Sequence, residues 1–281
     1  MPGPDTVRYG GNTTCLEITT DEGNKIIIDG GSGIRQLGLD QLAKLPVTVS
    51  LFITHTHWDH IQGLPFYTPL FIRGNKINIY GAFDPVYRKD IREILATQME
   101  YCYFPVRESE LMADITYTSL KEGEPITVGS TSVTPILLNH PVLNFGYKVE
   151  SNGKKFFFTG DYEPATNIYD ADEDGYDLYQ EMVDKQNEII SEFIRDADAA
   201  VMDAQYTTEE YKTKKGWGHG TYDSCIALAK KSRVKNLYLT HHDPTRKDEK
   251  LDLIYEELKT KYPNEAGFSM SLAIEGTEIV L

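Results

Sequence analysis

Four residues of metal-binding type lie within six positions after one apolar segment of the chain. The segment Val47–Ile53 has the composition of a strand, and the residues HTHWDH follow it after one threonine. Because a strand alternates its side chains between two faces, His55 and His57 point the same way, and Asp59 and His60 follow on the turn. Imidazole and carboxylate groups suit zinc, manganese or iron, and a site without thiolates keeps a position open for water. The spacing predicts two catalytic half-sites.

A single histidine at a strand end is more often an ordinary polar residue than a metal ligand. The HTHWDH segment differs, because packing four polar side chains at the end of an apolar strand costs free energy unless something binds them. We therefore interpret this segment as a metal-binding motif.

Three further apolar runs end in a residue that can bind a metal. They are followed by Asn139-His140-Pro141, Thr159-Gly160-Asp161 and Thr240-His241-His242. The predicted ligands divide between two ions: His55, His57 and His140 for the first, Asp59, His60 and His241 for the second, and Asp161 as the bridge.

This order of ligands resembles that of the metallo-β-lactamase superfamily, and the resemblance runs from about Arg8 to the C-terminus. Lactam-cleaving members use a cysteine where this chain has Asp161, and Cys15, Cys102 and Cys225 all lie outside the motifs. The resemblance therefore disfavours antibiotic hydrolysis.

The segment Gly216–Thr221 resembles the ribonuclease Z and cyclic-nucleotide phosphodiesterase branch of that superfamily. In that branch a histidine two residues before a serine or threonine lies beside the metals and contacts the phosphate, which implies these roles for His219 and Thr221; Gly220 stands where serine is more usual. Thr221 also has the character of an N-cap for a helix over Tyr222–Ser232, and a helix N-terminus favours anions. Without the resemblance, a flexible glycine loop with an exposed histidine would be the preferred interpretation.

The resemblance implies a phosphodiesterase with two divalent transition metal ions, zinc or alternatively manganese. Two ions about 3.5 to 4 Å apart lower the pKa of a bound water and stabilise charge on a phosphoryl oxygen. Asp161 would hold the ion pair, Asp59 would orient the second ion, and His219 would stabilise the transition state or protonate the departing sugar oxygen.

The charge of the chain limits its substrate. Lys and Arg total 28 against 43 Asp and Glu, a net charge of −15, whereas binding a long polyanion depends on cationic side chains. Little more than a strand pair separates His140 from Asp161, where ribonuclease Z carries the arm that grips tRNA. We expect a small 3′,5′-cyclic nucleotide, hydrolysed to the 5′-monophosphate, and no long nucleic acid. The resemblance extends to enzymes of the anti-Pycsar type, which destroy cyclic nucleotide immune signals.

Three other functions stay open. One is a ribonuclease Z-like RNA endonuclease, which the acidity and the short connection disfavour. Another is a thioester or lactone hydrolase, which would share the metals without needing His219 and Thr221. The third is a nucleotide-binding protein without catalysis, which would not need a complete set of ligands.

The alternation of short β-rich runs with helical patterns predicts one α/β domain over residues 1–281, an αββα sandwich of two sheets flanked by helices. The expected strands are Cys15–Thr19, Lys25–Asp29, Val47–Thr54, Lys76–Tyr80, Ile115–Leu120, Ile126–Val128, Ser132–Leu138, Phe145–Glu150, Lys155–Thr159 and Asn236–Leu239. The expected helices are Gly63–Phe71, Pro85–Tyr103, Asp177–Arg195, Tyr222–Ser232 and Arg246–Lys261.

Two segments imitate known binding loops. Residues 29–33, Asp-Gly-Gly-Ser-Gly, lack the ending of a nucleotide P-loop, so we expect a tight turn that buttresses the metal site. The acidic run Asp170–Asp177 lacks the helices and terminal glutamate of an EF-hand, so we expect a solvated loop.

Partners and location follow from weaker signals. Before Thr6 the chain lacks a strand and turn that similar proteins have, so we expect a shortened edge or one covered by a second copy in a homodimer. The sequence shows no signal peptide or membrane-spanning run, and its three cysteines have no evident partners. We expect a cytoplasmic protein that does not contact membranes.

Overall fold

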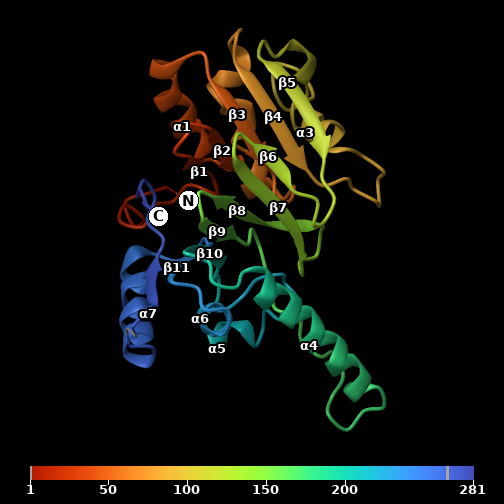
Figure 1. The fold of residues 1–281 in the computed structure, drawn as a ribbon, viewed down its shortest axis with the longest axis vertical. Helices are drawn as coiled ribbons and strands as arrows, with labels where there is room; N and C mark the ends of the chain where they lie inside the picture. Colours follow the sequence, from red (N-terminus) through yellow and green to blue (C-terminus); the bar gives the residue numbers. More distant parts are fainter. Residues whose placement is uncertain (1, 264–265) are drawn as a thin grey trace. The chain divides into compact units, whose positions relative to one another are not determined.

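The computed structural model describes residues 2–263 and 266–281 (Figure 1). Contacts divide the chain into two compact units, Gly11–Pro135 and Pro2–Gly10 with Ile136–Leu281. Each unit has its own cluster of buried apolar side chains. The single domain expected over residues 1–281 therefore stays a prediction.

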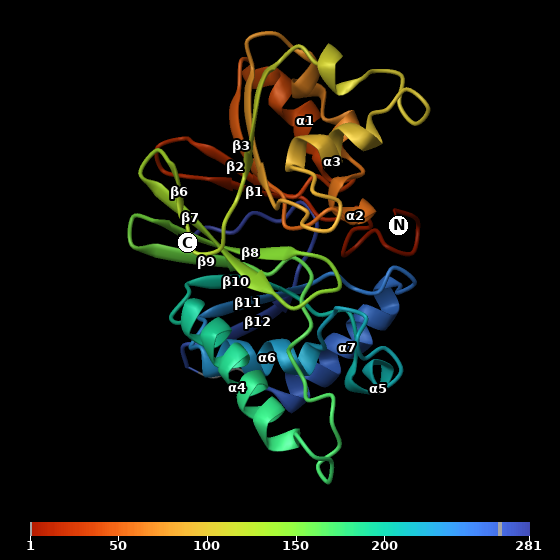
Figure 2. The same cartoon turned by 90° about the vertical axis from the view of Figure 1, so that its right-hand side faces the viewer.

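The first unit is built on a five-stranded sheet of order β1-β2-β3-β4-β5. β1 pairs antiparallel with β2, and the remaining neighbours are parallel. Helices α1 and α3 cover one face of this sheet (Figure 2). The elements are β1 (Leu16–Thr19), β2 (Lys25–Ile28), α1 (Ile34–Gln41), β3 (Thr48–Phe52), α2 (Trp58–Ile61), β4 (Lys76–Gly81), α3 (Ile91–Gln98), β5 (Asp114–Ser119), β6 (Ile126–Val128) and the first part of β7 (Thr131–Leu138).

Burial explains why the sequences of β2 and β3 are continuous apolar runs. Strands inside a parallel sheet bury both faces, and Ile26, Ile27 and Ile28 of β2 are fully buried, as are Leu51 and Phe52 of β3. The carboxyl end of β3 leads into the HTHWDH segment. A rigid, buried strand therefore positions the first metal-binding motif.

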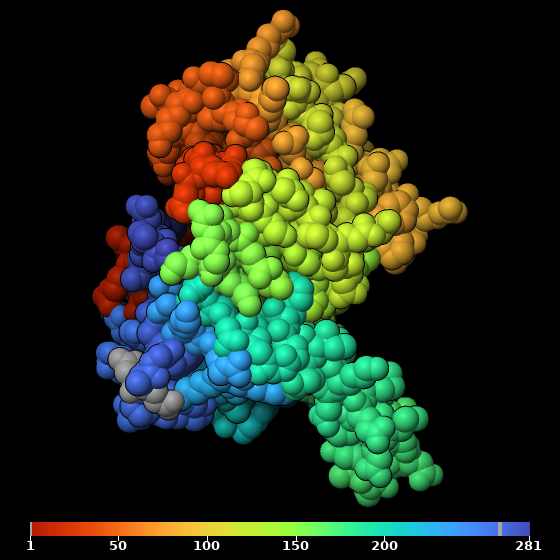
Figure 3. Space-filling view, viewed as in Figure 1, coloured from red at the N-terminus to blue at the C-terminus, as the bar shows by residue number. Residues whose placement is uncertain are grey.

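The second unit contains strands in the order β12-β11-β10-β9-β8-β7. β9, β10, β11 and β12 are parallel, and β8 pairs antiparallel with β9. Helices α4, α6 and α7 cover one face of this sheet (Figure 2), and the start of α4 extends away from it (Figure 3). The further elements are β8 (Asn144–Ser151), β9 (Lys154–Phe158), α4 (Tyr176–Phe193), β10 (Ala199–Asp203), α5 (Thr208–Tyr211), α6 (Tyr222–Lys231), β11 (Asn236–Thr240), α7 (Asp248–Lys261) and β12 (Ser269–Leu272).

Two expected helices are wrong in part. Instead of one helix over Gly63–Phe71 the chain forms two short 3₁₀ turns, Leu64–Phe66 and Thr68–Phe71, each with a proline in its first turn; proline lacks the N–H that a continuous helix needs. The helix expected over Pro85–Tyr103 shortens to α3.

The start of α3 shows which capping signal prevails. Asp84 accepts hydrogen bonds from the N–H groups of Val86 and Tyr87 and so forms a turn. Asp90 and Glu93 form the capping box that begins the helix. The helix therefore begins after Asp90, and the Asp84-Pro85 pair at the start of the expected helix lies in a turn.

Several smaller expectations concern the surface and the cysteines. Residues 170–175 of the acidic run form an exposed loop before α4, as expected. All three cysteines are free. Among the described residues, no helix combines the length and the apolar character needed to cross a bilayer.

Candidate active site

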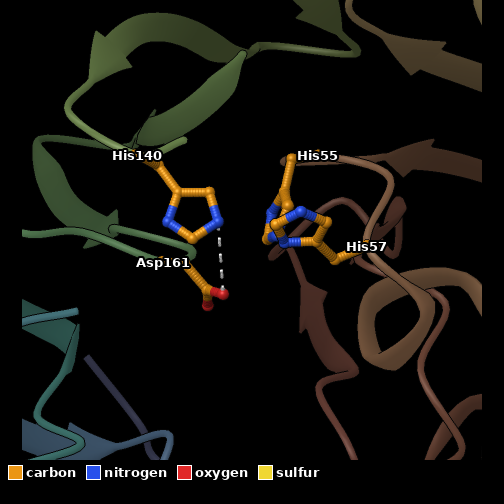
Figure 4. Close-up of side chains that lie close together, drawn as sticks. All are labelled: His55, His57, His140 and Asp161. Atoms are coloured by element: carbon orange, nitrogen blue, oxygen red, sulfur yellow. Dashed lines mark hydrogen bonds and ion pairs between the residues drawn. The ribbon is translucent and has the colours of Figure 1, made fainter. Parts of the chain in front are cut away.

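In the first unit, two histidines after β3 turn ring nitrogens toward each other. His55 is buried, and its Nε2 lies 3.1 Å from Nδ1 of His57 (Figure 4). The other ring nitrogen of His55 faces the Thr54 hydroxyl at 3.1 Å. This arrangement presents Nε2 of His55 and Nδ1 of His57 as a pair of donors for one cation.

The other two residues of the motif form a separate pair. Nδ1 of His60 lies 2.7 Å from Oδ2 of Asp29, and its Nε2 lies 3.6 Å from Oδ2 of Asp59. The side chains of the motif thus lie in two pairs, and their division into two half-sites stays a prediction.

Asp29 supports the motif from the turn after β2. Its carboxylate also accepts hydrogen bonds from the N–H and hydroxyl of Thr54, and burial raises its pKa. Asp29 adopts a φ of 64°, a left-handed conformation that is unusual for a residue with a side chain. This turn buttresses the histidines, as the sequence predicted.

In the second unit, Asp161 follows β9 and turns its two oxygens toward two different histidines. Oδ2 lies 3.8 Å from Nε2 of His140, and Oδ1 lies 3.2 Å from Nε2 of His241 (Figure 4 shows the first pair). Asp161 and His140 are almost completely buried. A carboxylate that faces a separate histidine with each oxygen has the geometry of a bridging ligand.

His219 is held by a carboxylate that the sequence analysis did not single out. Its Nδ1 lies 2.9 Å from Oδ2 of Asp203, which also accepts the N–H of Tyr162 at 3.0 Å. Asp203 is fully buried, and burial raises its pKa. The ring of His219 stacks on that of His241, with centroids 5.0 Å apart and planes at 15°. With Nδ1 engaged by Asp203, Nε2 of His219 is the ring nitrogen left for a substrate.

The loop that carries His219 ends in a helix cap. The Thr221 hydroxyl accepts the N–H of Ser224 and begins α6, as expected. At Gly220 a Cβ atom would lie 2.9 Å from the carbonyl oxygen of Asp203 and 3.1 Å from that of Tyr162. Close packing therefore favours glycine at this position. A contact of Thr221 with substrate stays a prediction.

The donor atoms of the second unit fit a divalent ion. One ligand atom from each of Asp161, Asp203, His219 and His241 lies within 4.8 Å of the others. The set combines nitrogen and carboxylate oxygen without thiolate, which suits zinc, manganese or iron. Because His219 belongs to this cluster, its role as acid rather than ligand needs its own test.

Two carboxylates near these ligands were missed. Asp203 ends the apolar run Ala199–Met202, and this is the same signal that indicates the other strand ends. Glu163 is almost completely buried and bonds to the loop before His219. Nothing in the sequence near Glu163 indicates this contact, because it depends on how distant segments fold.

Comparison with known proteins identifies the family. A family described as the Beta-lactamase superfamily domain matches residues 24–242. Ribonuclease Z of Staphylococcus haemolyticus is 24% identical over 281 residues, an alignment that covers 89% of each protein. The resemblance drawn from the motifs is confirmed at this level.

Two solved structures share the fold. The metallo-beta-lactamase fold protein YhfI from Bacillus subtilis aligns with a TM-score of 0.63 and 17% identity, covering 98% of this chain and 93% of that one. A diphosphatase from the PhnP family aligns with a TM-score of 0.62 and 19% identity, covering 96% of this chain and 84% of that one. At such identities the comparison establishes the fold, and the expected metallo-β-lactamase-like α/β class is confirmed.

Proposed function

The chain belongs to the beta-lactamase superfamily and is a metal-dependent hydrolase, and from that premise we propose that it hydrolyses a small phosphodiester, a 3′,5′-cyclic nucleotide, to the 5′-monophosphate. The ligand atoms, the electrostatics near His219 and the net charge each support one part of this proposal.

Two divalent ions, zinc or alternatively manganese, would be held by the ligands that the sequence predicts. Support comes from the family, from the order of ligands along the chain, and from the paired donors within each unit. The proposed ligands are His55, His57 and His140 for one ion, Asp59, His60 and His241 for the other, and Asp161 between them. When bound, such ions activate water and neutralise charge on a phosphoryl group.

The pairing of His219 with buried Asp203 carries the proposal of phosphoester chemistry. The Asp203 carboxylate accepts the Nδ1 proton of His219, which fixes the tautomer and orients Nε2. A histidine oriented in this way can donate a proton to a departing sugar oxygen or stabilise the charge of the transition state. A thioester or lactone hydrolase of this superfamily would not need this arrangement.

The size of the substrate follows from charge and from one short connection. The net charge of −15 disfavours a long nucleic acid. Between His140 and Asp161 the described chain forms only β8, β9 and their turns. A small cyclic nucleotide needs neither a basic surface nor a gripping arm. Destruction of a cyclic nucleotide signal, as in the anti-Pycsar type, would be one use of this activity.

A second candidate is an RNA endonuclease, because a curated relative that matches along most of the chain is named ribonuclease Z. The purified protein, reconstituted with zinc or manganese, should be assayed against 3′,5′-cyclic nucleotides, a precursor tRNA and a thioester. We expect turnover of at least one cyclic nucleotide to its 5′-monophosphate. Cleavage of precursor tRNA with no turnover of cyclic nucleotides would replace our proposal by the second candidate.

We also propose that the protein is a homodimer, as expected from its edge strand. β1 is four residues long and lies at one end of its sheet. Light scattering at micromolar concentration should give twice the mass of the chain, and the mass of a single chain would refute the dimer.

A further inference from the structure

Glu163 lies two positions after Asp161 and is only 4% exposed. Its Oε1 accepts hydrogen bonds from the Tyr211 hydroxyl and from the N–H of Gly216 at 2.8 Å. Its Oε2 accepts the N–H of Gly218 at 2.7 Å. A buried carboxylate is costly unless donors surround it, and here three donors converge on its two oxygens.

One end of this network reaches His140. The carbonyl oxygen of Gly218 lies 2.9 Å from Nδ1 of His140 and accepts its proton. Gly218 has a φ of 91°, and a Cβ atom there would lie 2.3 Å from Nδ1 of His140, so the backbone packs directly against the ring. Fixing the proton on Nδ1 leaves Nε2 of His140 as the metal-binding nitrogen, facing Asp161.

The backbone of Glu163 makes a second connection to the same ligand. Its N–H donates to the carbonyl oxygen of Asn139 at 3.1 Å, and the Asn139 side-chain amide donates to the carbonyl oxygen of Glu163 at 3.0 Å. Asn139 precedes His140 in the chain. Glu163 therefore ties the segment that carries Asp161 to the segment that carries His140.

The other end of the network reaches His219. Gly216 and Gly218 lie three residues and one residue before His219, and both bond to Glu163 through their N–H groups. Asp203 orients the ring of His219, whereas Glu163 fixes the backbone from which that ring extends. Loops rich in glycine have a high conformational entropy that such bonds must offset.

We propose that Glu163 is a positioning residue, which holds His140 and His219 in working geometry through the turn Gly216–Gly218. The roles of His140 as ligand and His219 as acid rest on the proposed function. Glu163 acts only through its neighbours and contacts neither metal nor substrate.

The Glu163→Gln variant tests the proposal because glutamine offers one acceptor oxygen where three donors converge. If that oxygen keeps Tyr211 and Gly216, the amide NH₂ group faces the N–H of Gly218, donor against donor. We expect the affinity for zinc, measured by competition with a chelator, to fall about 10- to 100-fold, the usual effect of losing a partner behind a metal ligand. The NMR signal of the Nδ1 proton of His140 should broaden or disappear.

Two further variants separate positioning from general stability. Tyr211→Phe removes one of the three donors and should lower zinc affinity less than Glu163→Gln, by about two- to tenfold. Asp198→Asn is the matched control: Asp198 accepts the N–H of Lys155 and the ammonium group of Lys235 where β10 begins, whereas the ligands follow strand ends. It should lower the unfolding midpoint and leave zinc affinity within twofold of wild type.

The positioning role would be overturned if Glu163→Gln kept its zinc affinity within twofold of wild type and kept a sharp NMR signal for the Nδ1 proton of His140. If that variant does not fold, unchanged zinc affinity in Tyr211→Phe would do the same. With bis(p-nitrophenyl) phosphate as substrate, kcat should fall while KM stays within threefold. An inactive wild-type protein would contradict the proposed function and leave the zinc and NMR results on Glu163 valid.

Discussion

The candidate site residues of the two units are arranged in opposite ways. In the first unit they are contiguous, because HTHWDH follows β3 and is supported by Asp29 from the turn after β2. In the second unit His140, Asp161, His219 and His241 come from separate segments between residues 140 and 241. The motif of the first unit offers paired donor atoms for metal ions. The second unit offers a carboxylate that faces two histidines, a histidine held by Asp203, and the backbone contacts made by Glu163.

The two sets of residues therefore need different kinds of structural support. A contiguous motif needs one buried strand to set its geometry, and one supporting carboxylate is enough. A dispersed set needs bonds between segments, which Asp203 and Glu163 make. Backbone strain accompanies both, since Asp29 and His241 have positive φ angles of 64° and 57°. Such conformations persist only where surrounding contacts impose them.

The largest expected effect comes from removing one ligand in each unit. His57→Ala and Asp161→Ala should each abolish hydrolysis of bis(p-nitrophenyl) phosphate, with the circular dichroism spectrum unchanged, because the ions carry the reaction. Elemental analysis should find more metal in His57→Ala, since Asp161 faces His140 and His241 with its two oxygens. Activity within threefold of wild type in either variant would contradict the ligand assignment.

The supporting carboxylates should differ in what they control. Asp203→Asn should lower kcat by roughly 10² to 10⁴ through the tautomer of His219, with both ions still bound. Asp29→Asn should instead weaken metal binding by about 10- to 100-fold through His60. Titration with zinc and steady-state kinetics on both variants check this contrast. An equal loss of metal in the two variants would contradict it.

The smallest expected effect concerns Thr221, which caps α6. Thr221→Ala should cost about 1 kcal/mol of unfolding free energy, the usual value of an N-cap, as measured by urea denaturation. Thr207→Ala, which removes the equivalent cap of α5, is the matched control for stability. A higher KM in Thr221→Ala alone would support a substrate contact, whereas equal KM values in both variants would exclude one.

The two units also differ in how many of their site residues can be predicted from the sequence. The motif after β3 could be predicted with its supporting turn. Its residues are neighbours in the chain, so their spacing determines which way their side chains point. His140, Asp161 and His241 could be predicted as ligands from strand ends, and Thr221 as a helix cap. In the structure Asp161 faces both His140 and His241, and their roles as ligands stay predictions.

What the sequence left out depends on tertiary packing or on competing local signals. Glu163 acts on residues about 50 positions away in the chain, so no local pattern marks it. The helix expected to begin at Pro85 instead begins after the capping box at Asp90. Strand β12 and helix α1 were not predicted, because their short runs are weak signals until their neighbours bury them.

The claim that His219 acts as an acid while other residues bind the metals is tested most directly by His219→Ala. Its metal content and its turnover should be measured on the same preparation. We predict two ions per chain, as in wild type, and a kcat on bis(p-nitrophenyl) phosphate lowered by roughly 10² to 10⁴, because an acid and not a ligand has been removed. Loss of an ion from His219→Ala would contradict the account, since His219 would then be a ligand and the assignment of His241 would have to be revised.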